Sequence, residues 1–277
     1  MADKVRLGRI QYLNVLPIYF ALEHLWGDNG FHLVAGTPAE LNAKMRRGEL
    51  DLGSISSMEY GRCPQDYLLL PDLSISSRGP AGSVLMFSRA PFAELDGQAV
   101  RVSSASASGA ALLKVLLTEL FKVQPVYQQG PVTGEGAAGV ADTLAIGDEA
   151  LRLKAEGLWP YQLDLGAAWQ ELCGLPFVFG VWAVRRDFAE ADPESATALH
   201  RLLLSSRNWG LNALPYLSRL AGGKLGLSAT QVLDYFRQLD YSLGPDHEKG
   251  LMIFFQYLQD RGELKELPEL EYLGGGG

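Results

Sequence analysis

The fold of this chain is indicated by the stretch Leu50-Asp51-Leu52-Gly53-Ser54-Ile55-Ser56-Ser57, in which a short apolar run leads into a serine-rich turn. The pattern recurs about fifty residues later, where Ala99-Val100-Arg101-Val102 is followed by Ser103-Ser104-Ala105-Ser106-Ala107-Ser108. Each turn precedes a helical stretch, so each marks the end of a strand and the start of a helix. Two such units predict an α/β fold.

The two serine turns are candidate anion-binding sites. The first N–H groups of a helix have no partner within the helix, and small side chains leave them accessible to a ligand. Serine hydroxyls add further donors. Serine is also a common helix cap, so either turn alone has a purely structural explanation as well. The pair, placed at the carboxyl ends of strands, predicts a ligand with two negative groups.

Strands and helices alternate on either side of these turns. The first part of the chain is predicted to form strands at 5–11, 31–35, 50–54, 67–70 and 83–88, and helices at 15–25 and from Pro38. A second unit is predicted to form strands at 99–102, 126–128 and 143–146, and helices at 107–122 and from Asp148. The apolar run 177–184 predicts a buried strand, and the remainder is predicted to be helical. The glycine-rich stretch 130–139 is interpreted as a surface loop.

This order of elements predicts two lobes joined by two crossings. One lobe is expected to comprise residues 1–88 and 180–277, and the other residues 89–179, with crossings near 88–91 and 178–180. Crossings of this kind act as hinges and place a ligand in the cleft between the lobes.

Composition limits the classes of partner. The net charge of −8 argues against a general nucleic-acid or membrane-surface role, for which a basic face is expected. It is compatible with an anionic ligand, because helix N-termini bind anions locally. No apolar run approaches membrane-spanning length. The sequence therefore predicts a small-molecule ligand and leaves the oligomeric state open.

The N-terminus and the cysteines indicate the compartment. Met1-Ala2-Asp3-Lys4 runs directly into a strand-like segment, without an apolar stretch of the signal-peptide type. Cys63 and Cys173 stand in no metal-ligand spacing, and the four histidines are scattered. We therefore expect a cytoplasmic location, no metal site and no cofactor.

Nucleophilic catalysis is not indicated, since the sequence has no Gly-x-Ser-x-Gly elbow and no paired cysteine and histidine. Asn14, at the first strand-to-helix turn, is either a ligand contact or a helix cap. Ser83, after a turn-rich passage, belongs either to a plain connection or to the lip of the cleft. Asp148 is interpreted as a helix cap and Asp142 as a turn residue.

An ordered set of motifs resembles a known family. These motifs are Ile10-Gln11-Tyr12-Leu13-Asn14, Leu52-Gly53-Ser54-Ile55-Ser56-Ser57, Gly82-Ser83, the serine turn at 103–108, Leu144-Ala145-Ile146-Gly147-Asp148, Asp164-Leu165-Gly166 with Trp169, and Leu175-Pro176-Phe177. Together they resemble the menaquinone-biosynthesis chorismate dehydratases of the futalosine route. The resemblance implies a two-lobed fold of the type II periplasmic-binding-protein kind, with a cleft between the lobes and a helical C-terminal tail.

The resemblance also implies an activity, that of a carbon–oxygen lyase. Water is lost from chorismate, a dianion, to give 3-[(1-carboxyvinyl)oxy]benzoate, with the enolpyruvyl carboxylate of the substrate as one candidate base. On this interpretation Asn14 orients the reacting groups. The substrate carboxylates are expected at Ser56, Ser57 and the N–H groups of Ser104, Ala105 and Ser106, and the walls at Ser83, Ile146 and Gly147.

Two alternatives remain open. A sister enzyme that makes dihydroxynaphthoate has the same fold, but no histidine is placed to serve as its base. The other alternative is a non-enzymatic binding protein for a small dicarboxylate, because fold alone does not separate an enzyme from a solute-binding protein. Conversion of chorismate to the aromatic product by the pure protein would distinguish the dehydratase from both alternatives.

Overall fold

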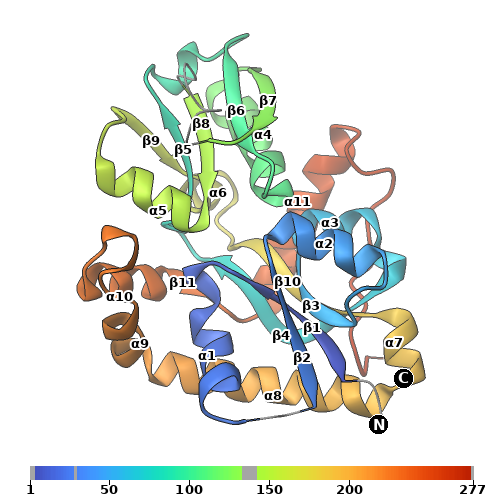
Figure 1. The fold of residues 1–277 in the computed structure, drawn as a ribbon. Helices are drawn as coiled ribbons and strands as arrows, with labels where there is room; N and C mark the ends of the chain where they lie inside the picture. The colour runs from blue at the N-terminus through green and yellow to red at the C-terminus, as the bar shows by residue number, and fades with distance from the viewer. Residues whose placement is uncertain (1–3, 28–29, 133–141, 276–277) are drawn as a thin grey trace.

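The computed structural model describes residues 4–27, 30–132 and 142–275, which form two α/β lobes, each built on its own sheet (Figure 1). Most of the glycine-rich stretch 130–139 lies outside these residues. The predicted α/β fold class is confirmed, because both sheets contain parallel strands connected through helices.

The first lobe contains a six-stranded sheet with the strand order β11-β4-β10-β3-β1-β2. β1 is parallel to both β2 and β3, whereas β10 is antiparallel to β3 and β4. Every residue of β3 is buried, which explains its short continuous apolar pattern in the sequence. The strands are β1 (Val5–Ile10), β2 (Phe31–Gly36), β3 (Leu52–Ser56), β4 (Tyr67–Ser77), β10 (Phe177–Arg185) and β11 (Leu239–Asp240).

Helices between these strands begin where the sequence predicts. The Thr37 hydroxyl accepts from the Glu40 N–H, and the Glu40 carboxylate accepts from the Thr37 N–H, so the two residues form a capping box. Pro38 occupies the first helical position. The helices are η1 (Leu13–Val15), α1 (Leu16–His24), α2 (Pro38–Arg46), α3 (Ser57–Arg62) and η2 (Pro64–Asp66).

The second lobe contains a five-stranded sheet with the order β7-β6-β8-β5-β9. The inner face of α4 buries a leucine stripe at the predicted helical spacing, including Leu113, Leu116 and Leu117. The elements are β5 (Val84–Ser88), η3 (Phe92–Glu94), β6 (Ala99–Ser103), α4 (Ala107–Phe121), β7 (Val126–Gly130), β8 (Asp142–Ile146), α5 (Gly147–Glu156), β9 (Tyr161–Asp164) and α6 (Leu165–Cys173).

The connections between the sheets lie several residues from the expected crossings. β5 was expected in the first lobe, but it pairs antiparallel with β8 and β9 of the second sheet. Residues 178–180 were expected to form a crossing, but they lie within β10 of the first sheet. The chain therefore passes between the sheets at 78–83 and at 174–176.

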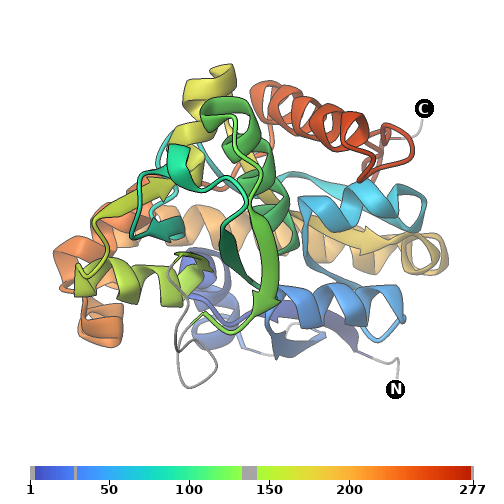
Figure 2. The same cartoon turned by 90° about the horizontal axis from the view of Figure 1, so that it is seen from above.

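The predicted helical tail follows β10. Its last helix lies beside α6 of the second lobe (Figure 2). The rings of Phe254 and Tyr257 pack against Trp169 of α6. Among the helices of the described residues, none has both the length and the apolar character needed to cross a bilayer. The tail consists of α7 (Arg186–Ala191), α8 (Pro193–Asn212), α9 (Leu214–Ala221), η5 (Lys224–Gly226), α10 (Ala229–Gln238) and α11 (Pro245–Asp260).

Candidate functional site

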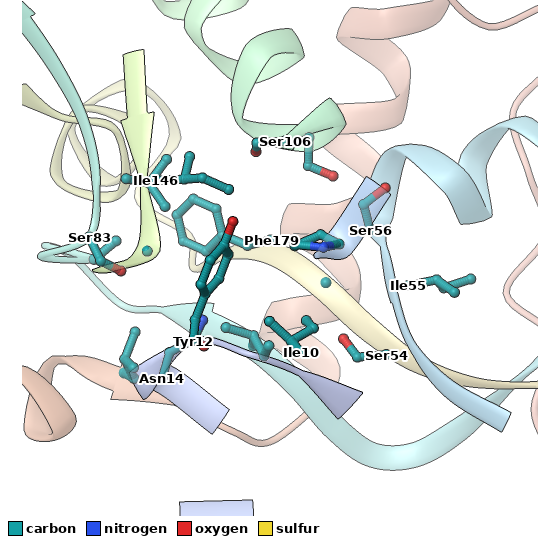
Figure 3. Close-up of a pocket in the computed structure, with 18 residues that line it drawn as sticks. Ile10, Tyr12, Asn14, Ser54, Ile55, Ser56, Ser83, Ser106, Ile146 and Phe179 are labelled. Atoms are coloured by element: carbon teal, nitrogen blue, oxygen red, sulfur yellow. The ribbon is translucent and has the colours of Figure 1, made fainter. Parts of the chain in front are cut away.

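A pocket of about 660 Å³, including its opening to solvent, lies where the two lobes meet (Figure 3). Its lining comes from the ends of β1 and β3 in the first lobe, from the connection before β5, and from β8 and α4 in the second lobe. Six predicted site residues line it: Asn14, Ser56, Ser83, Ser106, Ile146 and Gly147.

The lining is mostly apolar, and its polar groups are uncharged. Serine hydroxyls, the Asn14 amide and the Tyr12 phenol supply the polar side chains, and none of the described residues that line the pocket is Asp, Glu, Lys, Arg, His or Cys. Burial raises the pKa of Tyr12 to about 12, and the carboxylates of Asp148, Glu149 and Glu40 raise it further, so the phenol is protonated at neutral pH. The pocket therefore offers neutral hydrogen-bonding groups to its ligand.

Asn14 has an unpaired acceptor in this pocket. Its side chain caps neither η1 nor α1, so the helix-cap interpretation is wrong. The side-chain Oδ1 is buried and has no hydrogen-bond partner within the described part of the chain. The backbone is fixed, because the Tyr241 hydroxyl donates to the Asn14 carbonyl at 2.7 Å. A buried acceptor without a partner is costly, and a ligand with a donor removes that cost.

Ser56 is held rigidly at the end of β3. Its hydroxyl oxygen accepts from the Asn42 amide at 3.0 Å and from the Glu59 N–H at 3.1 Å. The Asn42 side-chain oxygen in turn accepts from the Ser56 N–H at 3.2 Å. Ser57 does not line the pocket, because its fully buried hydroxyl donates to the Val178 carbonyl. Of this turn, the structure brings only Ser54, Ile55 and Ser56 to the pocket.

The second turn contributes Ser106 and Ser108. Ser106 caps α4 by accepting from the Gly109 N–H at 3.0 Å. α4 has fifteen residues, and the positive end of its dipole lies at this wall of the pocket. Ser104 is exposed, and neither it nor Ala105 is among the lining residues.

The sequence analysis named Ile146 as a wall but missed the aromatic residues Tyr12 and Phe179. In Figure 3 the Tyr12 ring stands in the pocket, with Ser83 and Asn14 to one side and Ser54 and Ser56 to the other. Gly147, with φ of +57°, approaches the Tyr12 ring so closely that an added Cβ would lie 2.8 Å from it. Tyr12 lies inside the motif Ile10–Asn14, which was quoted for the family resemblance. Phe179 lies in an apolar strand, whose sequence does not indicate a site.

Two hydrogen bonds join the lobes beside the pocket. The Met58 N–H of α3 donates to the Ser108 hydroxyl of α4 at 3.0 Å. The Leu13 N–H donates to the Asp148 carboxylate at 2.8 Å. Burial raises the pKa of Asp148, although the Leu13 N–H and Lys224 partly oppose this shift. Asp148 was expected to cap its own helix, but it makes no cap contact and instead contacts the opposite lobe.

Asp142 was interpreted as a turn residue, but it is the first residue of β8. Its carboxylate accepts from the Arg89 N–H at 3.0 Å, next to the end of β5. Neither this group nor any other in the described residues forms a cluster of three His, Cys, Asp or Glu side chains that could hold a metal ion.

Comparison with protein families decides the family. A family described as menaquinone biosynthesis matches residues 5–260. The chain belongs to this menaquinone biosynthesis family. One similar member, a chorismate dehydratase from Thermus thermophilus, is 31% identical over 267 residues, covering 91% of this chain and 94% of the relative. Another, a 1,4-dihydroxy-6-naphtoate synthase from the same organism, is 28% identical over 191 residues, or 68% of each chain.

Solved structures place this member of the menaquinone biosynthesis family in the periplasmic-binding-protein-like fold. The periplasmic aliphatic sulphonate binding protein of Escherichia coli aligns with a TM-score of 0.66 at 14% identity, covering 98% of this chain and 96% of the other. The predicted two-lobed fold is thereby confirmed. At this identity the likeness concerns the fold alone.

Proposed function

We propose that this chain is a chorismate dehydratase, which removes water from chorismate to give 3-[(1-carboxyvinyl)oxy]benzoate. The relative from Thermus thermophilus supports this activity. The observation that carries the proposal is the lining of the pocket, whose described residues offer neutral donors from both lobes and include no ionised base. Such a site suits a reaction in which the substrate brings its own base.

We assign each carboxylate of chorismate to one of the two serine turns that contribute to the lining of the pocket. On this proposal one carboxylate accepts from the Ser56 hydroxyl, whose own proton is free because Asn42 and the Glu59 N–H already donate to its oxygen. The other lies at the start of α4, near Ser106, where the helix dipole favours an anion. The apolar surfaces of Tyr12 and Ile146 enclose the ring.

The chemistry then proceeds with little help from protein acids or bases. The enolpyruvyl carboxylate takes the proton from C3, and the electron pair is delocalised onto the ring carboxylate. The C4–O bond breaks, the leaving hydroxide takes the former C3 proton from the enolpyruvyl carboxylic acid and departs as water, and the ring becomes aromatic. The protein orients the dianion and stabilises the charge that develops on the ring carboxylate, using donors fixed in advance.

Asn14 has a defined place in this scheme. When both carboxylates of chorismate are ionised, the C4 hydroxyl is the only hydrogen-bond donor that the substrate has. We therefore assign the unpaired Asn14 Oδ1 to that hydroxyl, which is the leaving group. The contact fixes C4 relative to the carboxylate that takes the C3 proton.

The sister activity, dihydroxynaphthoate synthesis, is less compatible with this pocket. Its expected base is a histidine, and no histidine is among the lining residues. His200 Nε2 contacts the Pro71 carbonyl, and His247 contacts Asp240, so both have other partners.

The test is incubation of the purified protein with chorismate, followed by ultraviolet absorbance and mass spectrometry. We expect an aromatic product lighter than chorismate by one water. The rate should be independent of pH between about 6 and about 10, because the substrate carboxylates are ionised and Tyr12 is still protonated over that range. Binding without conversion would instead identify a dicarboxylate-binding protein. A pH profile with a midpoint near 6.5 would indicate a histidine base and contradict the mechanism.

A further inference from the structure

The Ser83 hydroxyl contacts a tyrosine from the C-terminal helical tail. Tyr235 of α10 lies 2.8 Å from Ser83, measured between the two hydroxyl oxygens, and both residues are buried. Ser83 lines the pocket, whereas Tyr235 does not. The proposed mechanism so far gives Tyr235 no role.

The chemistry of the two hydroxyls sets the direction of this hydrogen bond. A phenol is a stronger donor and a weaker acceptor than an aliphatic alcohol, so Tyr235 donates and Ser83 accepts. Burial raises the pKa of Tyr235, which keeps its proton in place. The Ser83 proton then remains free to be donated to a group in the pocket.

The backbone around Ser83 is fixed as well. The Asp164 carboxylate accepts from the Ala81 N–H at 2.8 Å and from the Gly82 N–H at 2.7 Å. The Ser83 carbonyl accepts from the Gly147 N–H at 2.7 Å. With the backbone held in this way, the remaining freedom of Ser83 is rotation of its side chain and hydroxyl, and Tyr235 restricts it.

Gly82 makes the approach of Tyr235 possible. Its φ is +72°, and an added Cβ would lie 3.1 Å from the Tyr235 ring and 2.5 Å from the Gln238 side-chain oxygen. A side chain at this position would be strained by the positive φ and would crowd the Tyr235 ring. Both effects favour glycine at residue 82.

We propose that Tyr235 is a positioning residue, which fixes the Ser83 hydroxyl as a hydrogen-bond donor to an oxygen acceptor of the substrate. The inference rests on the proposed dehydration of chorismate and gives the helical tail a part in it. Since a donor fixed before binding costs no reorganisation during the reaction, loss of the phenol should slow turnover although Tyr235 does not touch the substrate.

The experiment compares Tyr235→Phe, Ser83→Ala and the double variant in the full-length chain. Tyr235→Phe keeps the ring and removes the hydroxyl, and we expect kcat/KM for chorismate to fall about tenfold. Ser83→Ala should lower it about a hundredfold. If Tyr235 acts through Ser83, the double variant should be as active as Ser83→Ala alone. Tyr272→Phe is the matched control, because Tyr272 donates to the distant Glu248 and its loss should leave kcat/KM unchanged.

The outcomes are distinguishable. If the wild-type protein forms no product, the proposed function fails, and the inference fails with it. If the wild type is active and Tyr235→Phe is equally active, only the inference is overturned. An additional loss in the double variant would show that Tyr235 acts on the fold and not through Ser83. If the turnover of Ser83→Ala is too slow to measure, the affinities of the two single variants and the double variant for chorismate, measured by calorimetry, can be compared in the same way.

Discussion

The serine turns at the starts of α3 and α4 look alike in the sequence but form different sites. At α3 the turn is buried, the helix has six residues, and the Ser56 hydroxyl is fixed by Asn42. At α4 the turn is partly exposed, the helix has fifteen residues, and within the described residues the Ser106 hydroxyl makes only its cap contact. The first turn therefore offers a fixed side-chain donor, and the second offers the N-terminus of a long helix.

This difference shows that a serine turn in the sequence does not by itself tell which of its hydroxyl and N–H groups can contact a ligand. At α3 the Met58 N–H is already occupied by Ser108 of the opposite lobe, and the Ser57 hydroxyl by a backbone carbonyl. What remains at that end of the pocket is the proton of Ser56. Three predictions test whether the two turns differ in this way and whether Asn14 acts separately from both.

The largest effect is expected from Ser106→Glu. The new carboxylate would lie where the proposed site receives an anion, and bringing like charges together away from water costs several kcal/mol. Since about 1.4 kcal/mol corresponds to a tenfold change, we expect the affinity for chorismate, measured by calorimetry, to fall about a thousandfold. Ser104→Glu is the control, because Ser104 is exposed and the effect of its charge should stay below about tenfold. If Ser106→Glu and the wild type bound chorismate with equal affinity, the assignment of a substrate carboxylate to the start of α4 would be wrong.

Asn14→Ala should affect turnover more than binding. Loss of one contact to the reacting groups typically lowers the rate about a hundredfold, so kcat should fall by that factor with a smaller change in KM. The melting temperature should stay close to wild type, because the side chain caps no helix. Asn212→Ala, at the exposed end of α8, is the matched control, because it removes the same side-chain amide away from the pocket and should leave kcat unchanged. A destabilised but fully active Asn14→Ala variant would contradict the assignment.

The smallest effect concerns stability. Ser56→Ala leaves the buried Asn42 amide without its acceptor and removes a helix cap, so it should lower the free energy of unfolding by about 1 to 3 kcal/mol. Ser106→Ala removes only a cap and should cost about 1 kcal/mol. Denaturant unfolding of both variants measures the difference. If the two losses were equal, the turns would be equally rigid and the comparison above would be wrong.

Local signals predicted most of the elements. The start of a helix at Pro38 and the apolar run of β10 were predicted, because they depend on residues close together in the chain. β9 was missed, since it is a short strand at the edge of its sheet with partly exposed side chains that show no alternation. The lobe to which β5 belongs depends on its pairing with β8, some sixty residues away, and no local pattern reports that.

The sequence by itself determined the α/β class, the two serine turns and the family resemblance, because each of these follows from residue types and their spacing. Only the tertiary structure decided which groups face the ligand. In the structure the Ser57 hydroxyl is bonded to a backbone carbonyl outside the pocket, and the Asp148 carboxylate contacts the opposite lobe. The tertiary structure also brought Tyr235 to Ser83, 152 residues apart in the chain. The physical reason is that a hydrogen bond is set by where its partners lie in space, and contacts between lobes join residues whose separation in sequence carries no pattern.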